Sequence, residues 1–101
     1  MANKEILDAL REEKPYLIEN FGVLSIGLFG SYAKGTERPD SDIDLLVEFK
    51  EPRFELLAGL HIYLEKKFGK RVEIIRKRKA LGDRFLKRIE ESIQYLSLIH
   101  I

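Results

Sequence analysis

The spacing of apolar residues along the chain predicts helices that alternate with short strands. Near the start, Ile6 and Leu10 recur at helical spacing after Asn3, which is a suitable N-cap. Gly22 is a suitable stop for this helical region. Pro15 fits poorly inside a helix, so we expect the helix either to kink there or to restart with Pro15 in its first turn.

Three runs of apolar and β-branched residues predict strands, over residues 23–29, 42–49 and 71–75. The first run is followed at once by a Gly-Ser pair. We expect Ser31 to cap a short helix that stops at Gly35. A polar loop then leads into the second run.

Two further helices are predicted in the second half of the chain. One of about 15 residues lies between Pro52 and Gly69, with an inner stripe expected to comprise Phe54, Leu57, Leu60, His61 and Leu64. The other runs from about residue 80 to residue 95, with an apolar residue at every fourth position: Leu81, Phe85, Ile89 and Ile93. The apolar end, residues 95–101, lacks a helical period and is compatible with an added strand, a docking segment or a frayed end.

This order of elements indicates an α/β or α+β domain whose sheet is covered by helices on at least one face, with the strand order left open. A chain of 101 residues predicts a single domain over residues 1–101. The absence of cysteine excludes a disulfide scaffold, a thiolate metal site and a cysteine nucleophile. No run of 18 apolar residues is present and the first residues lack the apolar stretch of a signal peptide, so we expect a cytoplasmic protein without membrane contact.

The charged residues are unevenly distributed along the chain, although the formal net charge is only +1. Residues 66–88 contain 11 basic and 2 acidic side chains, whereas residues 1–65 contain 7 basic and 13 acidic ones. Such a basic segment is typical of a protein that meets a phosphate-bearing ligand or an acidic partner, and equally of a solvated helix face. Aromatic residues are sparse in it, so direct nucleic-acid binding is not favoured.

The candidate chemistry begins where the first predicted strand gives way to a short helix. Gly30 leaves room for a ligand to approach the backbone, and the amides that follow it can bind phosphate. The Ser31 hydroxyl can add a hydrogen bond, and Lys34 can add positive charge to the same anion. These residues predict a phosphate site at this turn.

Acidic residues follow on two of the predicted strands. Asp42 and Asp44 are two residues apart, which places both carboxylates on one face of a strand. Adjacent carboxylates repel each other unless a hard cation neutralises them, and Mg²⁺ takes such oxygen ligands together with substrate phosphates. If the third strand lies beside the second, Glu73 joins them, and three carboxylates can hold two metal ions about 4 Å apart.

Each of these residues has a simpler explanation when it is taken alone. Gly30 and Ser31 fit an ordinary turn with a cap, and Asp42 and Asp44 fit loop-bonded and solvated positions. Glu73 fits the exposed edge of a sheet. The agreement between spacing, strand position and helix start favours phosphate and metal chemistry over the separate explanations.

Gly-Ser, ten further residues (32–41), Asp-x-Asp and then an acidic residue on a later strand form a specific pattern. With it, the sequence resembles the minimal nucleotidyltransferases of the polymerase-beta-like superfamily, over essentially the whole chain. The resemblance implies the polymerase-beta-like nucleotidyltransferase fold, with a small mixed sheet and flanking helices. It also implies transfer of a nucleoside monophosphate from a nucleoside triphosphate, with release of pyrophosphate.

The resemblance further implies which residues act. The nucleotide would be bound by Gly30, Ser31, Lys34 and Ser41, and two Mg²⁺ ions by Asp42, Asp44 and Glu73. Glu73 would also assist deprotonation of the acceptor hydroxyl. Two positions depart from the common family pattern, since Lys34 replaces an arginine and loses its bidentate geometry, and Glu73 replaces an aspartate.

Small stand-alone members of this family resemble the antitoxin half of HEPN/MNT toxin–antitoxin pairs, the MntA type. There the antitoxin blocks an all-helical HEPN-type ribonuclease by binding it, by adding AMP to one of its tyrosines (AMPylation), or both. The resemblance therefore implies ATP as donor and a HEPN-type toxin as partner, and it is compatible with a homo-oligomer. Two alternatives remain open: a catalytically weak binding module that masks a partner, and a nucleotidyltransferase with a small-molecule acceptor.

Overall fold

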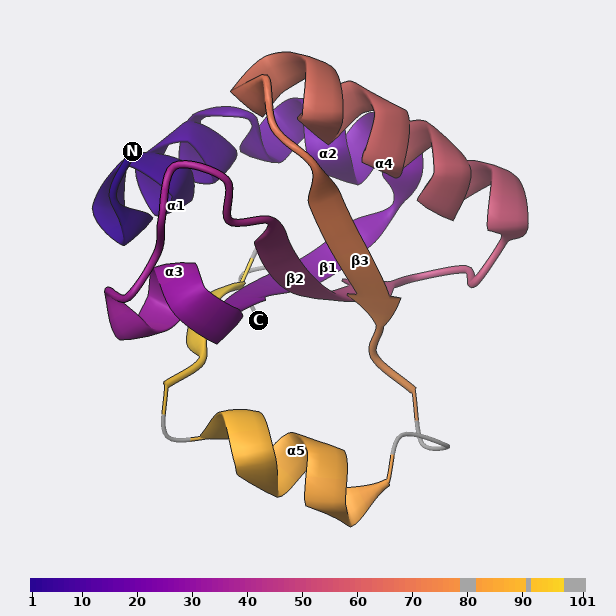
Figure 1. Cartoon of the computed structure of the whole chain (residues 1–101). Coiled ribbons are helices and arrows are strands. Elements are labelled where there is room, and N and C mark those ends of the chain that lie inside the picture. Colours follow the sequence, from indigo (N-terminus) through magenta and orange to yellow (C-terminus); the bar gives the residue numbers. More distant parts are fainter. Residues whose placement is uncertain (79–81, 91, 98–101) are drawn as a thin grey trace.

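A computed structural model gives the structure of the chain and describes residues 1–78, 82–90 and 92–97 (Figure 1). Its centre is a four-stranded sheet with the strand order β3-β2-β1-β4. The strands span Val23–Phe29 (β1), Ile43–Phe49 (β2), Val72–Arg76 (β3) and Gln94–Ser97 (β4). β1 pairs antiparallel with β2 and β4, whereas β2 pairs parallel with β3. The predicted mixed sheet is therefore confirmed.

Strand β2 lies inside the sheet, and its side chains alternate between the two faces. Ile43, Leu45 and Val47 are fully buried on one face. Asp44 and Leu46 take the opposite face, where Leu46 is also fully buried. A carboxylate thus stands near the start of a strand whose next three residues are fully buried.

Three helices cover the face that carries Leu45, and they lie above the sheet in Figure 1. They are α1 (Asn3–Glu12), α2 (Lys14–Phe21) and α4 (Phe54–Phe68). Pro15 stands in the first turn of α2, where no backbone N–H is needed, so the helical region restarts there as one of the two expected outcomes. α2 and α4 both end at a glycine in the left-handed conformation, Gly22 and Gly69, as predicted.

Helix α5 (Asp83–Glu90) lies on the other face, below the sheet in Figure 1. Ile89 packs against Phe29 and Leu46 in a second, smaller apolar cluster. Phe85 meets Phe29 edge-on, with 5.9 Å between the ring centroids. Helices therefore cover both faces of the sheet, and none in the described part of the chain is long and apolar enough to cross a lipid bilayer.

The C-terminal helix is shorter than the sequence pattern predicts. It ends at Glu90 rather than near residue 95, and Gln94–Ser97 forms β4 instead. Ile93 continues the four-residue apolar spacing, but it reaches the second cluster from the connection between α5 and β4. Of the three alternatives left open for the apolar end, the structure shows the added strand, up to Ser97, while residues 80–81 and 98–101 lie outside the described part.

Three local expectations are wrong. Helix α1 begins at Asn3 itself, with Ala2 as N-cap residue. The short helix α3 (Gly30–Lys34) begins at Gly30, so Ser31 lies inside its first turn instead of capping it. Phe54 is 80% exposed, so the buried stripe of α4 begins further along the helix, at Leu56 and Leu57.

Candidate active site

The turn after β1 presses the backbone of Gly30 against the side chain of Asp44. Gly30 has a φ of +75°, a left-handed conformation that favours glycine. A Cβ atom at this position would also overlap with Oδ2 of Asp44. Phe29 and Asp44 are register partners between β1 and β2, so strand pairing itself creates this contact. The Gly-Ser turn and the carboxylate are therefore neighbours.

The parallel pairing of β2 with β3 confirms that the third strand lies beside the second. Asp44 and Glu73 are register partners, which places both side chains on the same face of the sheet. This is the face that also carries α5. Asp42 precedes the first residue of β2 by one position and is half-buried. Sheet pairing thus unites carboxylates that are about 30 residues apart in the sequence.

Burial and neighbouring negative charge raise the pKa of Asp44 from 3.8 to about 6. Burial is the largest cause, followed by the charges of Glu73 and Asp42 and by a hydrogen bond with Glu73. The three carboxyl groups therefore interact electrostatically. Such a cluster gains from any positive charge that enters it, whether a proton or a cation.

The raised pKa of Asp44 predicts a pH-dependent difference in thermal stability between the wild type and Asp44→Asn. Above pH 6 the wild type carries the repelling charge in its folded state, so the variant should melt a few degrees higher. As pH falls from 6 through 3.8, the folded protein takes up the proton first, and the difference should vanish. Melting curves in EDTA between pH 3.5 and pH 8 measure it, and a variant less stable at pH 8 would contradict the assignment.

The polar loop between α3 and β2 is held by its own turn and by a lysine from the connection between α4 and β3. The Ser41 hydroxyl accepts a hydrogen bond from the Arg38 N–H at 2.8 Å, and the Ser41 N–H donates to the Arg38 carbonyl at 2.9 Å. Lys70 Nζ donates to the Pro39 carbonyl at 2.6 Å and lies 5.8 Å from the centre of the Tyr32 ring. The loop that leads into Asp42 therefore has a defined path.

The remaining predicted nucleotide-binding residues lie on α3. Ser31 is half-buried in its first turn and Lys34 is exposed in its last turn. The Ser31 carbonyl accepts a hydrogen bond from the Thr36 N–H at 3.0 Å, which closes the helix at Gly35. Both side chains thus stand on the short helix that follows the Gly30 turn.

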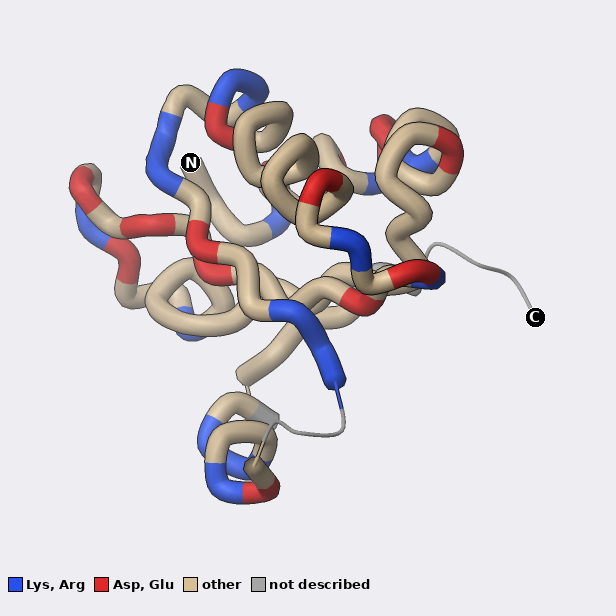
Figure 2. The backbone as a smooth tube through the Cα atoms, turned by 90° about the vertical axis from the view of Figure 1, so that its right-hand side faces the viewer, with Lys and Arg blue, Asp and Glu red and all other residues tan. Residues whose placement is uncertain are grey.

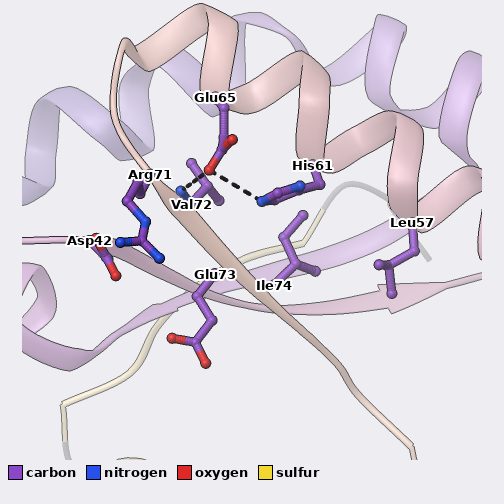
Figure 3. A pocket seen from close by; sticks show the side chains of 8 residues that line it. All are labelled: Asp42, Leu57, His61, Glu65, Arg71, Val72, Glu73 and Ile74. Carbon is purple, nitrogen blue, oxygen red and sulfur yellow. Dashed lines mark hydrogen bonds and ion pairs between the residues drawn. The ribbon is translucent and has the colours of Figure 1, made fainter.

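A cleft of about 530 Å³ opens beside the carboxylates (Figure 3). It is lined by Asp42, Leu57, His61, Glu65, Arg71, Val72, Glu73 and Ile74. The Glu65 carboxylate accepts a hydrogen bond from the Val72 N–H at 2.8 Å and lies 3.2 Å from His61 Nε2. The cleft therefore runs from the carboxylates along β3 toward α4.

The acidic cluster fits a hard divalent cation by its chemistry, since all three groups offer only oxygen ligands. Within residues 1–78, 82–90 and 92–97, no three His, Cys, Asp or Glu side chains already converge closely enough to hold an ion. The fit therefore rests on the donor type and on the closeness of Glu73 and Asp42 to Asp44, whose negative charges add to burial in raising the pKa of Asp44. Asp42, Asp44 and Glu73 are the candidate ligands.

The sequence pattern did not single out the residues that join β3 to α4. His61 was expected only as part of the inner stripe, yet its side chain is 42% exposed and pairs with Glu65. Their spacing of four residues on a predicted helix was the one available signal. The hydrogen bonds of Glu65 and Lys70 to backbone groups gave no signal, because only the tertiary structure brings those groups near.

Comparison with known proteins shows which protein family has this sequence pattern. The sequence profile described as "Nucleotidyltransferase domain" matches residues 4–96. A Methanocaldococcus jannaschii protein named "Putative protein adenylyltransferase MJ1379" is 42% identical over 95 residues, which are 91% of this chain and 95% of that protein.

Two solved structures have a similar fold. One, described as a putative minimal nucleotidyltransferase, has a TM-score of 0.73 and 36% identity and covers 93% of this chain and 95% of its own. The other comes from the complex of a tri-AMPylated Shewanella oneidensis HEPN toxin with an MNT antitoxin. Its TM-score is 0.57 at 20% identity, over 98% of this chain and 70% of its own. This second likeness concerns the fold alone.

Proposed function

This chain belongs to the nucleotidyltransferase domain family, and on that premise we propose that it transfers AMP from ATP to a hydroxyl group of a partner protein. The observation that carries the proposal is the meeting of Gly30, Asp44 and Glu73 at one end of the sheet. The name of the 42% identical relative, a protein adenylyltransferase, supports a protein as acceptor. Residues 1–101 would serve this one site as a single minimal domain.

The turn at Gly30 and the acidic cluster bind different parts of the donor, ATP and its metal ions. In this proposal the triphosphate lies against the Gly30 turn and is bound by Ser31 and Lys34, with Ser41 at the end of the loop. Asp42, Asp44 and Glu73 hold two Mg²⁺ ions. When bound, these ions neutralise phosphate charge and lower the pKa of the attacking hydroxyl.

The acidic residues also position the reacting groups. The acceptor oxygen attacks the α-phosphorus, the new O–P bond forms, and the bond to the pyrophosphate oxygen breaks on the opposite side. Glu73 is the exposed member of the cluster, at the edge of the sheet, and is therefore the group that an incoming hydroxyl meets first. It accepts the hydroxyl proton. Asp44 lies beside Glu73 on the inner strand β2, where the sheet fixes its position.

We further propose that the acceptor is a HEPN-type toxin and that the chain acts as its antitoxin. The fold shared with an MNT antitoxin solved in complex with a HEPN toxin supports this partner. An AMP group on a toxin tyrosine would add bulk and a negative charge to the toxin and so oppose its ribonuclease activity. A homo-oligomer is compatible with this proposal, but the proposal does not require one.

Transfer of label from α-³²P-ATP tests the proposed function. The acceptor offered is a purified HEPN-type protein from the same source as this chain. We expect label on a hydroxyl residue of that protein with Mg²⁺ present, and loss of at least about 99% of it in EDTA, because the carboxylates alone repel the triphosphate. Mass spectrometry then identifies the modified residue.

The two alternative functions predict different results in the same assay. Tight binding of the HEPN-type protein with no label under any condition would favour a module that only masks its partner. Label transferred to small hydroxyl compounds in a cell extract, and to no protein, would favour a small-molecule acceptor. Either result would contradict the proposed protein adenylylation.

A further inference from the structure

Strand β3 forms one edge of the sheet, and no other strand in the described part of the chain lies along its outer side. The Arg71 carbonyl accepts from the Ile43 N–H at 2.9 Å, and the Lys77 N–H donates to the Val47 carbonyl at 2.7 Å. Odd-numbered residues of this segment therefore direct their backbone groups to β2. Because backbone groups alternate along a strand, residues 72, 74 and 76 direct theirs outward.

Among residues 1–78, 82–90 and 92–97, a side chain bonds only to the first of these outward groups. The Val72 N–H donates to Glu65, a carboxylate from α4 (Figure 3). Beyond this point the Val72 carbonyl, both backbone groups of Ile74 and the Arg76 N–H face the open side of the sheet. An uncovered edge of this kind is a template for an added strand.

The cleft connects this open edge to the carboxylates. It is lined by Leu57 and Ile74 at one end and by Asp42 and Glu73 at the other. In Figure 3 the Glu73 side chain points away from α4, toward the face of the sheet that carries Asp44. A segment laid along the edge would therefore pass directly beside Glu73.

We propose that an extended segment of the acceptor protein, one that lies outside its helices, pairs with the outer edge of β3, with its hydroxyl-bearing residue in register with Glu73. Side chains in register on neighbouring strands share one face, and neighbouring strands lie about 4.8 Å apart. A tyrosine or serine at that position therefore projects over the same face as Glu73 and Asp44. The inference rests on the proposed function and names how its acceptor is held.

The charges around the edge indicate the composition of the segment. Arg71, Arg76 and Lys77 stand at the two ends of β3, and Figure 2 shows further basic residues along α5. A paired segment with acidic residues on either side of its hydroxyl residue complements them. A polypeptide is favoured over a small molecule because the outward groups of β3 are backbone donors and acceptors at strand spacing.

Hydrogen exchange on the complex with the HEPN-type protein tests this pairing without any catalysis. In the absence of nucleotide, binding should slow exchange of the Ile74 and Arg76 amides about tenfold or more. The Ile75 amide, already bonded to β2, serves as the internal reference. AMP transfer without protection of these two amides would overturn the proposal. Protection without transfer would support it and would contradict the proposed function instead.

Proline substitution at the outward positions gives a second readout. Ile74→Pro removes an N–H that the β2–β3 pairing does not use, so an edge strand can accommodate it. We expect it to weaken binding of the HEPN-type protein about tenfold or more, whereas Ile74→Val keeps the N–H and should bind far better than the proline variant. Arg76→Pro compared with Arg76→Gln repeats the test if Ile74→Pro does not fold. Equal binding within a folded pair would refute the pairing.

Discussion

Replacing Asp44 by asparagine is expected to lower AMP transfer about a thousandfold, the largest loss of any single substitution in the chain. Asp44 interacts with both other carboxyl groups and contacts the Gly30 turn. The substitution removes one negative charge from the point where the proposed cations and phosphates meet. The initial rate of label transfer from α-³²P-ATP to the HEPN-type protein measures the loss.

The matched control for this substitution is Asp40→Asn. Asp40 is an exposed acidic residue in the loop that leads into Asp42, so the change in net charge is the same. Its transfer rate should remain close to that of the wild type. Because Asp44→Asn is also expected to be the more stable protein at neutral pH, unfolding cannot account for its lost activity. A variant that kept a tenth of the wild-type rate would contradict the role of Asp44.

Gly30→Ala is expected to reduce transfer about a hundredfold and to destabilise the fold by about 1–3 kcal/mol. An alanine here must adopt a left-handed conformation, and its Cβ would overlap with Oδ2 of Asp44. The clash moves either the carboxylate or the turn that is proposed to bind the triphosphate. Transfer assays and denaturant unfolding measure the two effects separately.

Gly35→Ala separates the clash from the backbone strain. Gly35 has nearly the same φ, +73°, but nothing lies within 4 Å of the position that its Cβ would take. It should therefore lose about 1 kcal/mol of stability while it keeps most of its activity. If both variants lost activity to the same degree, the contact between Gly30 and Asp44 would not matter for the reaction.

The strands were predictable because their residues carry a strong local signal. The pattern predicted 23–29 and 42–49, and the structure has Val23–Phe29 and Ile43–Phe49. Both are short runs rich in apolar and β-branched residues, bounded by glycine or by polar loops. The end of the last helix was not predictable in this way. Ile93 maintains the helical spacing, yet it packs on the same cluster as Ile89 from outside the helix.

The position of β4 shows why the C-terminal segment needed the tertiary structure. Gly27 of β1 has no side chain, and the side chains of Ile93 and Tyr95 approach the space that a Cβ would fill. Tyr95 is the register partner of Gly27, and the Gln94 side chain donates to the Ala33 carbonyl at 3.4 Å. These contacts join positions more than 60 residues apart, which periodicity along the chain cannot reveal.

The sequence by itself determined the Gly-Ser turn, the spacing of Asp42 and Asp44, and the apolar strand that carries Glu73, because these features follow from neighbouring residues. Only the tertiary structure decided that Glu73 lies in register with Asp44 and that Gly30 contacts the same carboxylate. It also decided that β3 lies at an open edge. Strand order and register depend on how whole elements pack together, and that packing free energy is shared among residues far apart in the chain.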